Sequence, residues 1–231
     1  MRRFFAAFLF ALSILMGATA VILVLPFSRR TMPTRIMQWW GRTVLWGAGI
    51  KLQVEGLEHV DANRPCIYMS NHESTIDIPA LIAALPVHLR FVYKQSLGYV
   101  PFVGWAIWAM GMVPIDRSNR SKAMVSLKKA GKQVKSGLPV LIFPEGTRAH
   151  GTGLLPFKKG GFVLALNAGL DVVPITLVAS HKLCSRNSFL ARSGVLRVVI
   201  HPRIQVENVA SVPRDQLMQR VRESMSSAIN Y

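Results

Sequence analysis

The chain begins with two long apolar segments and then changes to short apolar runs separated by turns. Residues 4–27 contain no charge, and a helix of this length, rising about 1.5 Å per residue, is long enough to cross a hydrocarbon core of about 30 Å. Residues 34–50 predict a second helix, whose tryptophans beside arginines are typical of a lipid headgroup interface. We therefore expect residues 1–50 to anchor the protein to a membrane.

The way in which residues 4–27 meet the membrane stays open. Arginines flank the segment on both sides, so the positive-inside rule does not choose an orientation. The segment either spans the bilayer or lies within one leaflet. A cleaved signal peptide with GATA as its cleavage site is an alternative, but the apolar run continues past that site, so we expect the segment to be retained.

The pattern after Gly49 predicts an α/β domain over residues 51–231. Runs of strand length lie at residues 51–56, 65–70, 90–94, 111–116, 138–143, 171–178 and 195–204. Segments of helical length lie between or after them, at residues 77–85, 101–110, 120–135, 157–168 and 214–229. Strands that alternate with helices favour a single domain with a mostly parallel mixed sheet flanked by helices.

Charge and composition narrow the class of partner. The chain has 28 Lys and Arg against 11 Asp and Glu, a net charge of +17, and is 51% hydrophobic. Such a basic and apolar chain favours an anionic membrane over nucleic acid, for which no recognition motif is present. Residues 117–137 hold seven basic residues and no acid, which indicates either a solvated helix face or a contact with anionic lipid. Two cysteines make no disulfide framework and fit a reducing compartment.

A histidine and an aspartate stand where an apolar strand gives way to a helix. Positions i and i+5 of a helix point about 140° apart, so His72 and Asp77 can pair only across a turn. The turn is expected at the carboxyl end of a strand, where open α/β sheets hold their sites. A carboxylate on one imidazole nitrogen leaves the other nitrogen to accept a proton. The alternative is a helix-capping aspartate beside a turn histidine.

A second polar cluster follows a later strand. It consists of Glu145, Gly146, Thr147 and Arg148, followed by the run Lys158, Lys159, Gly160 and Gly161. Gly146 allows close backbone approach, and the guanidinium of Arg148 suits a phosphate. Arg117 follows another strand in the same manner. The glycines and lysines lack the spacing of a Walker loop. The alternative is a surface turn with a Glu145–Arg148 ion pair.

Four blocks, NHESTID, GMVPIDR, FPEGTR and VVPITL, occur in this order within about 110 residues. They resemble the four motif blocks of the glycerolipid acyltransferase family, and the branch acting on 1-acyl-glycerol 3-phosphate looks closest. The resemblance covers residues 50–205. Ala149 stands where members often have serine, and LVASHKL, after the fourth block, does not align. Both departures leave the choice of acceptor open.

The resemblance implies transfer of a fatty acyl group from acyl-CoA or acyl carrier protein to the 2-hydroxyl of a 1-acyl-glycerol 3-phosphate, which gives phosphatidic acid. His72 oriented by Asp77 is then the general base, and a serine or cysteine nucleophile is not required because a thiolate leaves readily. Acceptor binding is expected at Arg148, Arg117, Glu145, Gly146, Thr147 and Lys94.

The implied partners are a lysophospholipid, the thioester donor and membrane lipid, with no nucleic acid, cofactor or metal. Thioester donors are cytoplasmic, so we expect a bacterial-type inner membrane with the catalytic domain on its cytoplasmic face. Other acceptors stay open: a lyso-ornithine lipid, another lysophospholipid or glycerol 3-phosphate. Outside the enzymes, the alternative is a basic membrane protein that binds lipid without turnover.

Overall fold

The protein is described here by a computed structural model that covers residues 2–24, 31–149, 153–186, 188, 190–206 and 213–229. A seven-stranded sheet has the order β1-β7-β6-β2-β5-β3-β4. Its strands are β1 (Ile50–Glu55), β2 (Ile67–Ser70), β3 (Arg90–Lys94), β4 (Val113–Ile115), β5 (Val140–Ile142), β6 (Val172–Val178) and β7 (Gly194–Ile200). Every neighbouring pair is parallel except β6 and β7, which confirms the mostly parallel mixed sheet.

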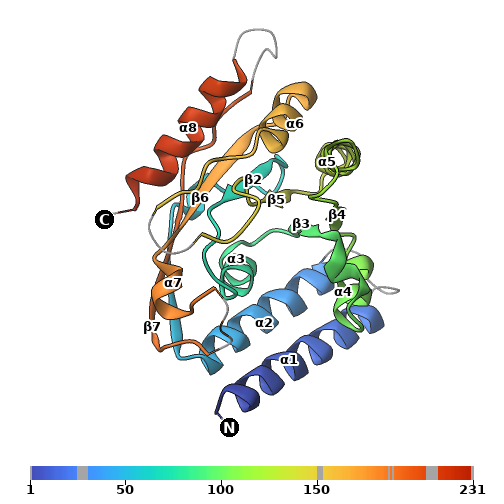
Figure 1. Ribbon diagram of the computed structural model, residues 1–231, viewed down its shortest axis with the longest axis vertical. Coiled ribbons are helices and arrows are strands. Elements are labelled where there is room, and N and C mark those ends of the chain that lie inside the picture. The colour runs from blue at the N-terminus through green and yellow to red at the C-terminus, as the bar shows by residue number, and fades with distance from the viewer. Residues whose placement is uncertain are drawn as a thin grey trace.

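Helices cover both faces of the sheet (Figure 1). They are α1 (Arg2–Val24), α2 (Thr31–Gly47), α3 (Asp77–Ala84), α4 (Val103–Ala109), α5 (Arg120–Lys135), α6 (Gly160–Ala168), α7 (Ser180–Leu183) and α8 (Arg214–Ser227). Two short 3-10 helices, η1 (Leu57–His59) and η2 (Gln95–Tyr99), complete the described elements. The sequence did not predict α7 or the two 3-10 helices, because three to five residues are too few to show a helical period.

Alternate residues of β2 enter two separate cores. Tyr68 packs with α3 on one face of the sheet, whereas Ile67 and Met69 pack with α5, α6 and α8 on the other. All of β2 is buried, as expected for a parallel strand covered on both faces. The carboxyl ends of β2, β5, β6, β3 and β4 therefore share one edge of a rigid sheet.

The two N-terminal helices lie side by side along one flank of the molecule (Figure 1). Trp40 is half-buried, and a side chain at Gly17 of α1 would meet its ring at 3.2 Å. Trp39 and Trp46 point outward, with exposed fractions of 63% and 82%. In the described ranges, no helix is long and apolar enough to cross a bilayer. Residues 25–27 of the predicted apolar segment lie outside the described residues.

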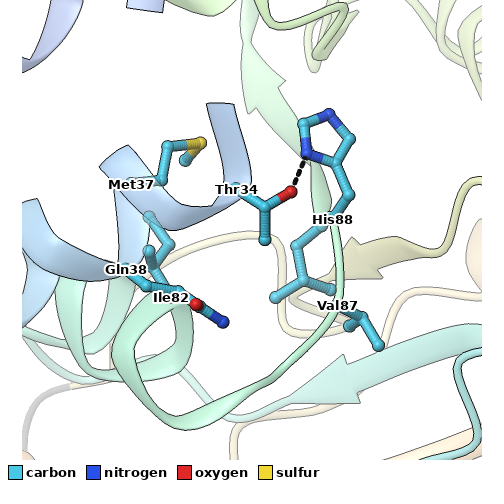
Figure 2. Close-up of a pocket in the computed structure, with 7 residues that line it drawn as sticks. Thr34, Met37, Gln38, Ile82, Val87 and His88 are labelled. Carbon is cyan, nitrogen blue, oxygen red and sulfur yellow. Dashed lines mark hydrogen bonds between the residues drawn. The ribbon is translucent and has the colours of Figure 1, made fainter. Parts of the chain in front are cut away.

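Helix α2 is held to the loop after α3 by polar contacts, and Figure 2 shows the one between Thr34 and His88. The Gln38 Nε2 donates a hydrogen bond to the carbonyl of Leu85 at 2.9 Å, and the Thr34 hydroxyl bonds with the His88 Nδ1. A small pocket remains between these side chains and Ile82. These bonds fix the N-terminal region against the α/β core.

Helix α6 begins three residues later than the sequence predicted. The predicted start was residue 157, but the N–H of Lys158 donates to the carbonyl of Pro144 at 2.8 Å and Phe157 stacks against Phe162. The segment before α6 is thus tied to the turn after β5. This contact brings two lysines, Lys158 and Lys159, to the carboxyl edge of the sheet.

Candidate active site

The turn between β2 and α3 joins the histidine and the aspartate. His72 Nδ1 lies 2.7 Å from Asp77 Oδ2, and Asp77 is fully buried as the first residue of α3. The same oxygen accepts hydrogen bonds from the backbone N–H groups of Glu73 and Ser74 at 2.7 and 2.8 Å. Asp77 therefore both orients the imidazole and closes the turn that carries it.

The backbone and ring of His72 are fixed by the segment after β5. Its N–H donates to Glu145 Oε1 at 3.0 Å, and its carbonyl accepts from the N–H of Ala149 at 2.7 Å. The ring stacks on Phe143 with a centroid distance of 4.0 Å and an interplanar angle of 16°. The imidazole thus has one rotational setting, with its plane and backbone both held.

Arg148 lies against the second nitrogen of the same ring. Its Nε–H donates to His72 Nε2 at 3.4 Å, while Nη1 donates to the carbonyl of Arg186 at 2.8 Å. An imidazole that carries its proton on Nδ1 satisfies both contacts, because Nδ1–H donates to the Asp77 carboxylate and Nε2 accepts from Arg148. The lone pair of Nε2 then accepts from Arg148, and it could take a proton from a bound hydroxyl once this contact is released.

Arg117, which is exposed, lies near the half-buried Arg148, so two cations gather at the turn after β5. Arg117 Nη1 donates to the carbonyl of Gly146 at 2.6 Å. Burial lowers the pKa of both guanidiniums, and the charge of Arg148 further lowers that of Arg117. An arginine nevertheless remains charged at neutral pH. Two partly desolvated like charges close together attract an anion strongly, since it would relieve their repulsion.

Gly146 must be glycine for the turn to form. Its φ is +69°, a left-handed conformation that side chains other than glycine rarely adopt. An added Cβ would also meet the stem of Lys158 at 2.8 Å. Lys158, a member of the predicted cluster that was not among the expected binding residues, therefore packs over this turn.

Glu145 faces inward and holds the turn. Its Oε2 accepts from the N–H of Leu155 at 3.0 Å, so both carboxyl oxygens take backbone donors, and only 2% of the residue is exposed. Burial raises its pKa to about 7, against the effect of the two N–H donors. The structure does not form the alternative Glu145–Arg148 surface pair, because the carboxylate is directed to the backbone.

The remaining predicted residues take different positions. Thr147 is exposed, and its hydroxyl accepts from Arg186 Nη2 at 3.2 Å. Lys94 ends β3 at the same sheet edge and is exposed. Arg186 was missed, because nothing in the run HKLCSRN distinguishes it from an ordinary surface arginine.

A second histidine–carboxylate pair flanks the turn. His181 Nδ1 lies 2.7 Å from Glu73 Oε2, and Asn71 pairs with both backbone groups of Leu177 at 2.8 and 2.9 Å. These contacts tie β2 to the end of β6 and to α7. They explain the polar residues around His72 as supports of the turn.

An apolar cavity of about 440 Å³ leads to the site from the N-terminal helices. It is lined by hydrophobic side chains of α1, α2, α3, β3 and α4, among them Trp40, Ile78 and Ile107, and Arg148 lies on its lining. The arrangement joins a proton acceptor, two cations and an apolar chamber. Within the described ranges, no group of three or more His, Cys, Asp or Glu residues is arranged to hold a metal.

Comparison with known proteins gives a family match and several similar sequences. The model of a family described as Acyltransferase matches residues 51–178. A chloroplastic 1-acyl-sn-glycerol-3-phosphate acyltransferase of Brassica napus is 37% identical over 178 residues, 76% of this chain and 51% of the relative. The 1-acyl-sn-glycerol-3-phosphate acyltransferase of Pseudomonas aeruginosa is 35% identical over 211 residues, 89% of this chain and 80% of the relative.

A solved structure shares the fold. The crystal structure of the 1-acyl-sn-glycerophosphate acyltransferase PlsC from Thermotoga maritima superposes with a TM-score of 0.84 at 22% identity, covering 98% of this chain and 94% of that chain. The chain spans 51% of the length of the Brassica napus relative, and 61% of the length of a chloroplastic 1-acyl-sn-glycerol-3-phosphate acyltransferase of Arabidopsis thaliana that is 35% identical.

Proposed function

The chain belongs to the acyltransferase family, and from this premise we propose that it moves a fatty acyl group from a thioester donor to the 2-hydroxyl of 1-acyl-glycerol 3-phosphate, giving phosphatidic acid. The observation that carries the proposal is the pairing of His72 Nδ1 with Asp77 at 2.7 Å while Nε2 faces Arg148. A base and a phosphate-binding cation thus lie together, and this acceptor carries its hydroxyl and phosphate on adjacent carbons.

The reaction needs one proton acceptor and a good leaving group. The Nε2 of His72 takes the proton of the acceptor hydroxyl while its oxygen attacks the thioester carbonyl. The carbon–oxygen bond forms, the carbon–sulfur bond breaks, and the departing thiolate takes the proton back from the imidazolium. Asp77 stabilises the imidazolium between these two transfers.

Arg148 serves the acceptor phosphate in this proposal, and Arg117 assists it. Arg148 contacts His72 in the free protein, so an arriving phosphate exchanges the weak 3.4 Å contact with Nε2 for charge-assisted bonds to the guanidinium. That exchange uncovers the lone pair of Nε2 when the acceptor is bound. Glu145 and Gly146 shape the turn, while Thr147 and Lys94 lie at the periphery of the acceptor.

The apolar cavity and the exposed aromatic side chains support work at a membrane. A hydrocarbon chain suits the cavity of about 440 Å³ because its lining is almost wholly apolar. Trp39, Trp46, Trp105 and Trp108 are exposed on α2 and α4, which pack beside α1, and such rings favour the headgroup region. We propose attachment through residues 1–50 to a bacterial-type inner membrane, with the site on the cytoplasmic face.

Purified protein incubated with a thioester donor and a panel of acceptors tests the proposal. The expected result is free thiol and phosphatidic acid from 1-acyl-glycerol 3-phosphate, with less product from acceptors that lack the phosphate. A preference for a lyso-ornithine lipid or glycerol 3-phosphate would correct the acceptor. Lipid binding without thiol release would favour the lipid-binding alternative instead.

A further inference from the structure

A second and larger cavity, of about 750 Å³, lies between α5 and α6 on the other side of the catalytic turn. Strand β3 lies between the two cavities, because Phe91 lines the apolar cavity and the next residue, Val92, lines this cleft. Successive side chains of a strand point to opposite faces of a sheet. The two chambers therefore approach the carboxyl edge of the sheet from its two faces.

Both chambers end at groups that touch the base. Arg148, which donates to His72 Nε2, lies on the lining of the apolar cavity. Phe143, which stacks on the ring of His72, lies on the lining of the α5–α6 cleft together with Gly146. A substrate whose reacting atom sits at Nε2 thus has a chamber available on either side.

The α5–α6 cleft differs from the apolar cavity in its chemistry. Its floor is apolar, with Met124, Leu127 and Phe157, but Arg117, Lys158 and Lys159 also line it. None of the described residues that line the cleft is acidic. An apolar floor with cationic side chains suits a long, partly apolar ligand that ends in a phosphate.

A thioester donor has two unlike arms on either side of its carbonyl. One arm is a hydrocarbon, and the other is phosphopantetheine, which carries a dimethyl group, two amides and a phosphate. We infer that the α5–α6 cleft binds the phosphopantetheine arm, with Lys159 facing its phosphate, while the acyl chain enters the apolar cavity. The inference rests on the proposed function, since it presupposes a thioester donor.

The acceptor fits the cleft less well. Its phosphate is one carbon away from the reacting hydroxyl and must lie beside His72, where Arg148 is placed. Arg117 can assist at that phosphate, but the remainder of the acceptor is a hydrocarbon ester, which makes no use of Lys158 and Lys159. The extended, phosphate-ended arm of the donor therefore accounts better for both the size and the charge of the cleft.

Filling the cleft tests the inference directly. Ala123 of α5 lines the cleft and is half-buried, whereas Val125, two residues along, is 67% exposed and lines neither chamber. Ala123→Phe should raise the donor KM about tenfold or more and leave the acceptor KM within about twofold. Val125→Phe is the matched control and should change neither KM.

Removing the phosphate contact gives a second test that does not depend on packing. Lys159 is exposed, so Lys159→Ala should fold normally, and the loss of one charged contact should raise the KM for acyl-CoA about tenfold. An acyl-pantetheine without the phosphate should be a poor donor for wild type and Lys159→Ala alike. Lys51→Ala, at an exposed position of β1, is the control.

The lysines on the outer face of α5 can show whether the phosphopantetheine arm comes from acyl-CoA or from acyl carrier protein. Lys128→Glu combined with Lys132→Glu reverses two exposed charges beside the cleft. A rise in KM for acyl carrier protein alone identifies the protein-bound thioester as the source, because an acidic carrier would meet this face. An unchanged KM for both donors identifies acyl-CoA.

Failure of the inference and failure of the proposed function give different results. If Ala123→Phe and Lys159→Ala raise the acceptor KM and leave the donor KM unchanged, the cleft belongs to the acceptor and the inference is wrong, although acyl transfer stands. If wild type transfers no acyl group, calorimetric titration with coenzyme A still tests the cleft. Binding that Ala123→Phe abolishes supports the inference, and binding that it leaves intact contradicts it.

Discussion

Replacing Glu145 by glutamine probes the buried carboxylate beneath the catalytic turn. Its two oxygens accept from the N–H groups of His72 and Leu155, each at 3.0 Å. Burial raises its pKa to about 7 from an ordinary value of 4.5, and the negative charges of Glu73 and Asp77 act in the same direction. Glu145 is therefore a group whose protonation state changes near neutral pH.

The sign of the effect on stability follows from the raised pKa. The folded state binds the proton of the Glu145 carboxyl more tightly than the unfolded state does. The stabilisation that this proton gives to the folded protein is therefore fully present below pH 4.5 and is lost as the pH rises through about 7. The difference between the two pKa values corresponds to about 3 kcal/mol of unfolding free energy, at about 1.36 kcal/mol per unit. Glutamine does not titrate, and its loss of one acceptor lowers stability equally at every pH.

Urea unfolding of wild type and Glu145→Gln at about pH 4 and about pH 8 measures this contribution. The stability of wild type relative to the variant should fall by about 3 kcal/mol between the two conditions. His201, whose pKa burial lowers to about 4, titrates in both proteins and cancels in the comparison. If the stability difference between wild type and Glu145→Gln is the same at both pH values, the pKa of Glu145 is not raised. If wild type gains stability relative to the variant at about pH 8, the two N–H donors outweigh burial and lower the pKa.

Three further outcomes are expected. Asp77→Asn should lower kcat by about 10³- to 10⁴-fold in steady-state assays, because the imidazole loses its orienting charge. The Tm of this variant should fall as well, because Asp77 closes the turn. Arg148→Ala should lower acceptor kcat/KM roughly 10- to 150-fold with Arg148→Lys recovering part of it, and a raised donor KM would contradict the assignment. The protein should remain with sedimented membranes in high salt, since burial of apolar area is not screened, and release by salt alone would mean that only basic side chains hold it.

The local elements were predictable because their signals are local. The i+5 spacing of His72 and Asp77 excludes a continuous helix, and the structure joins the two side chains across the turn before α3. The strand-length run at residues 90–94 is β3 with the same bounds. Hydrophobic alternation and turn residues carry this information without any knowledge of distant contacts.

The strand order and parts of the candidate site were not predictable, because they depend on contacts between residues far apart in sequence. The antiparallel pairing of β7 with β6 and the strand order join strands that are distant in sequence, and no local pattern encodes them. Arg186 reaches the site through bonds to Thr147 and Arg148, 39 and 38 residues away. Lys158, which lines the α5–α6 cleft, is tied to the turn after β5 by the hydrogen bond of its N–H to the carbonyl of Pro144, 14 residues earlier.

The assignment of His72 as general base is tested most directly by one comparison. Wild type and His72→Ala are given a thioester donor and 1-acyl-glycerol 3-phosphate, thiol release is followed, and circular dichroism verifies that both proteins are folded. Loss of the base should reduce turnover by about 10²- to 10⁴-fold, leaving a folded protein without measurable transfer. A folded His72→Ala that keeps more than about a tenth of wild-type turnover would contradict the account, because general-base catalysis contributes far more than tenfold.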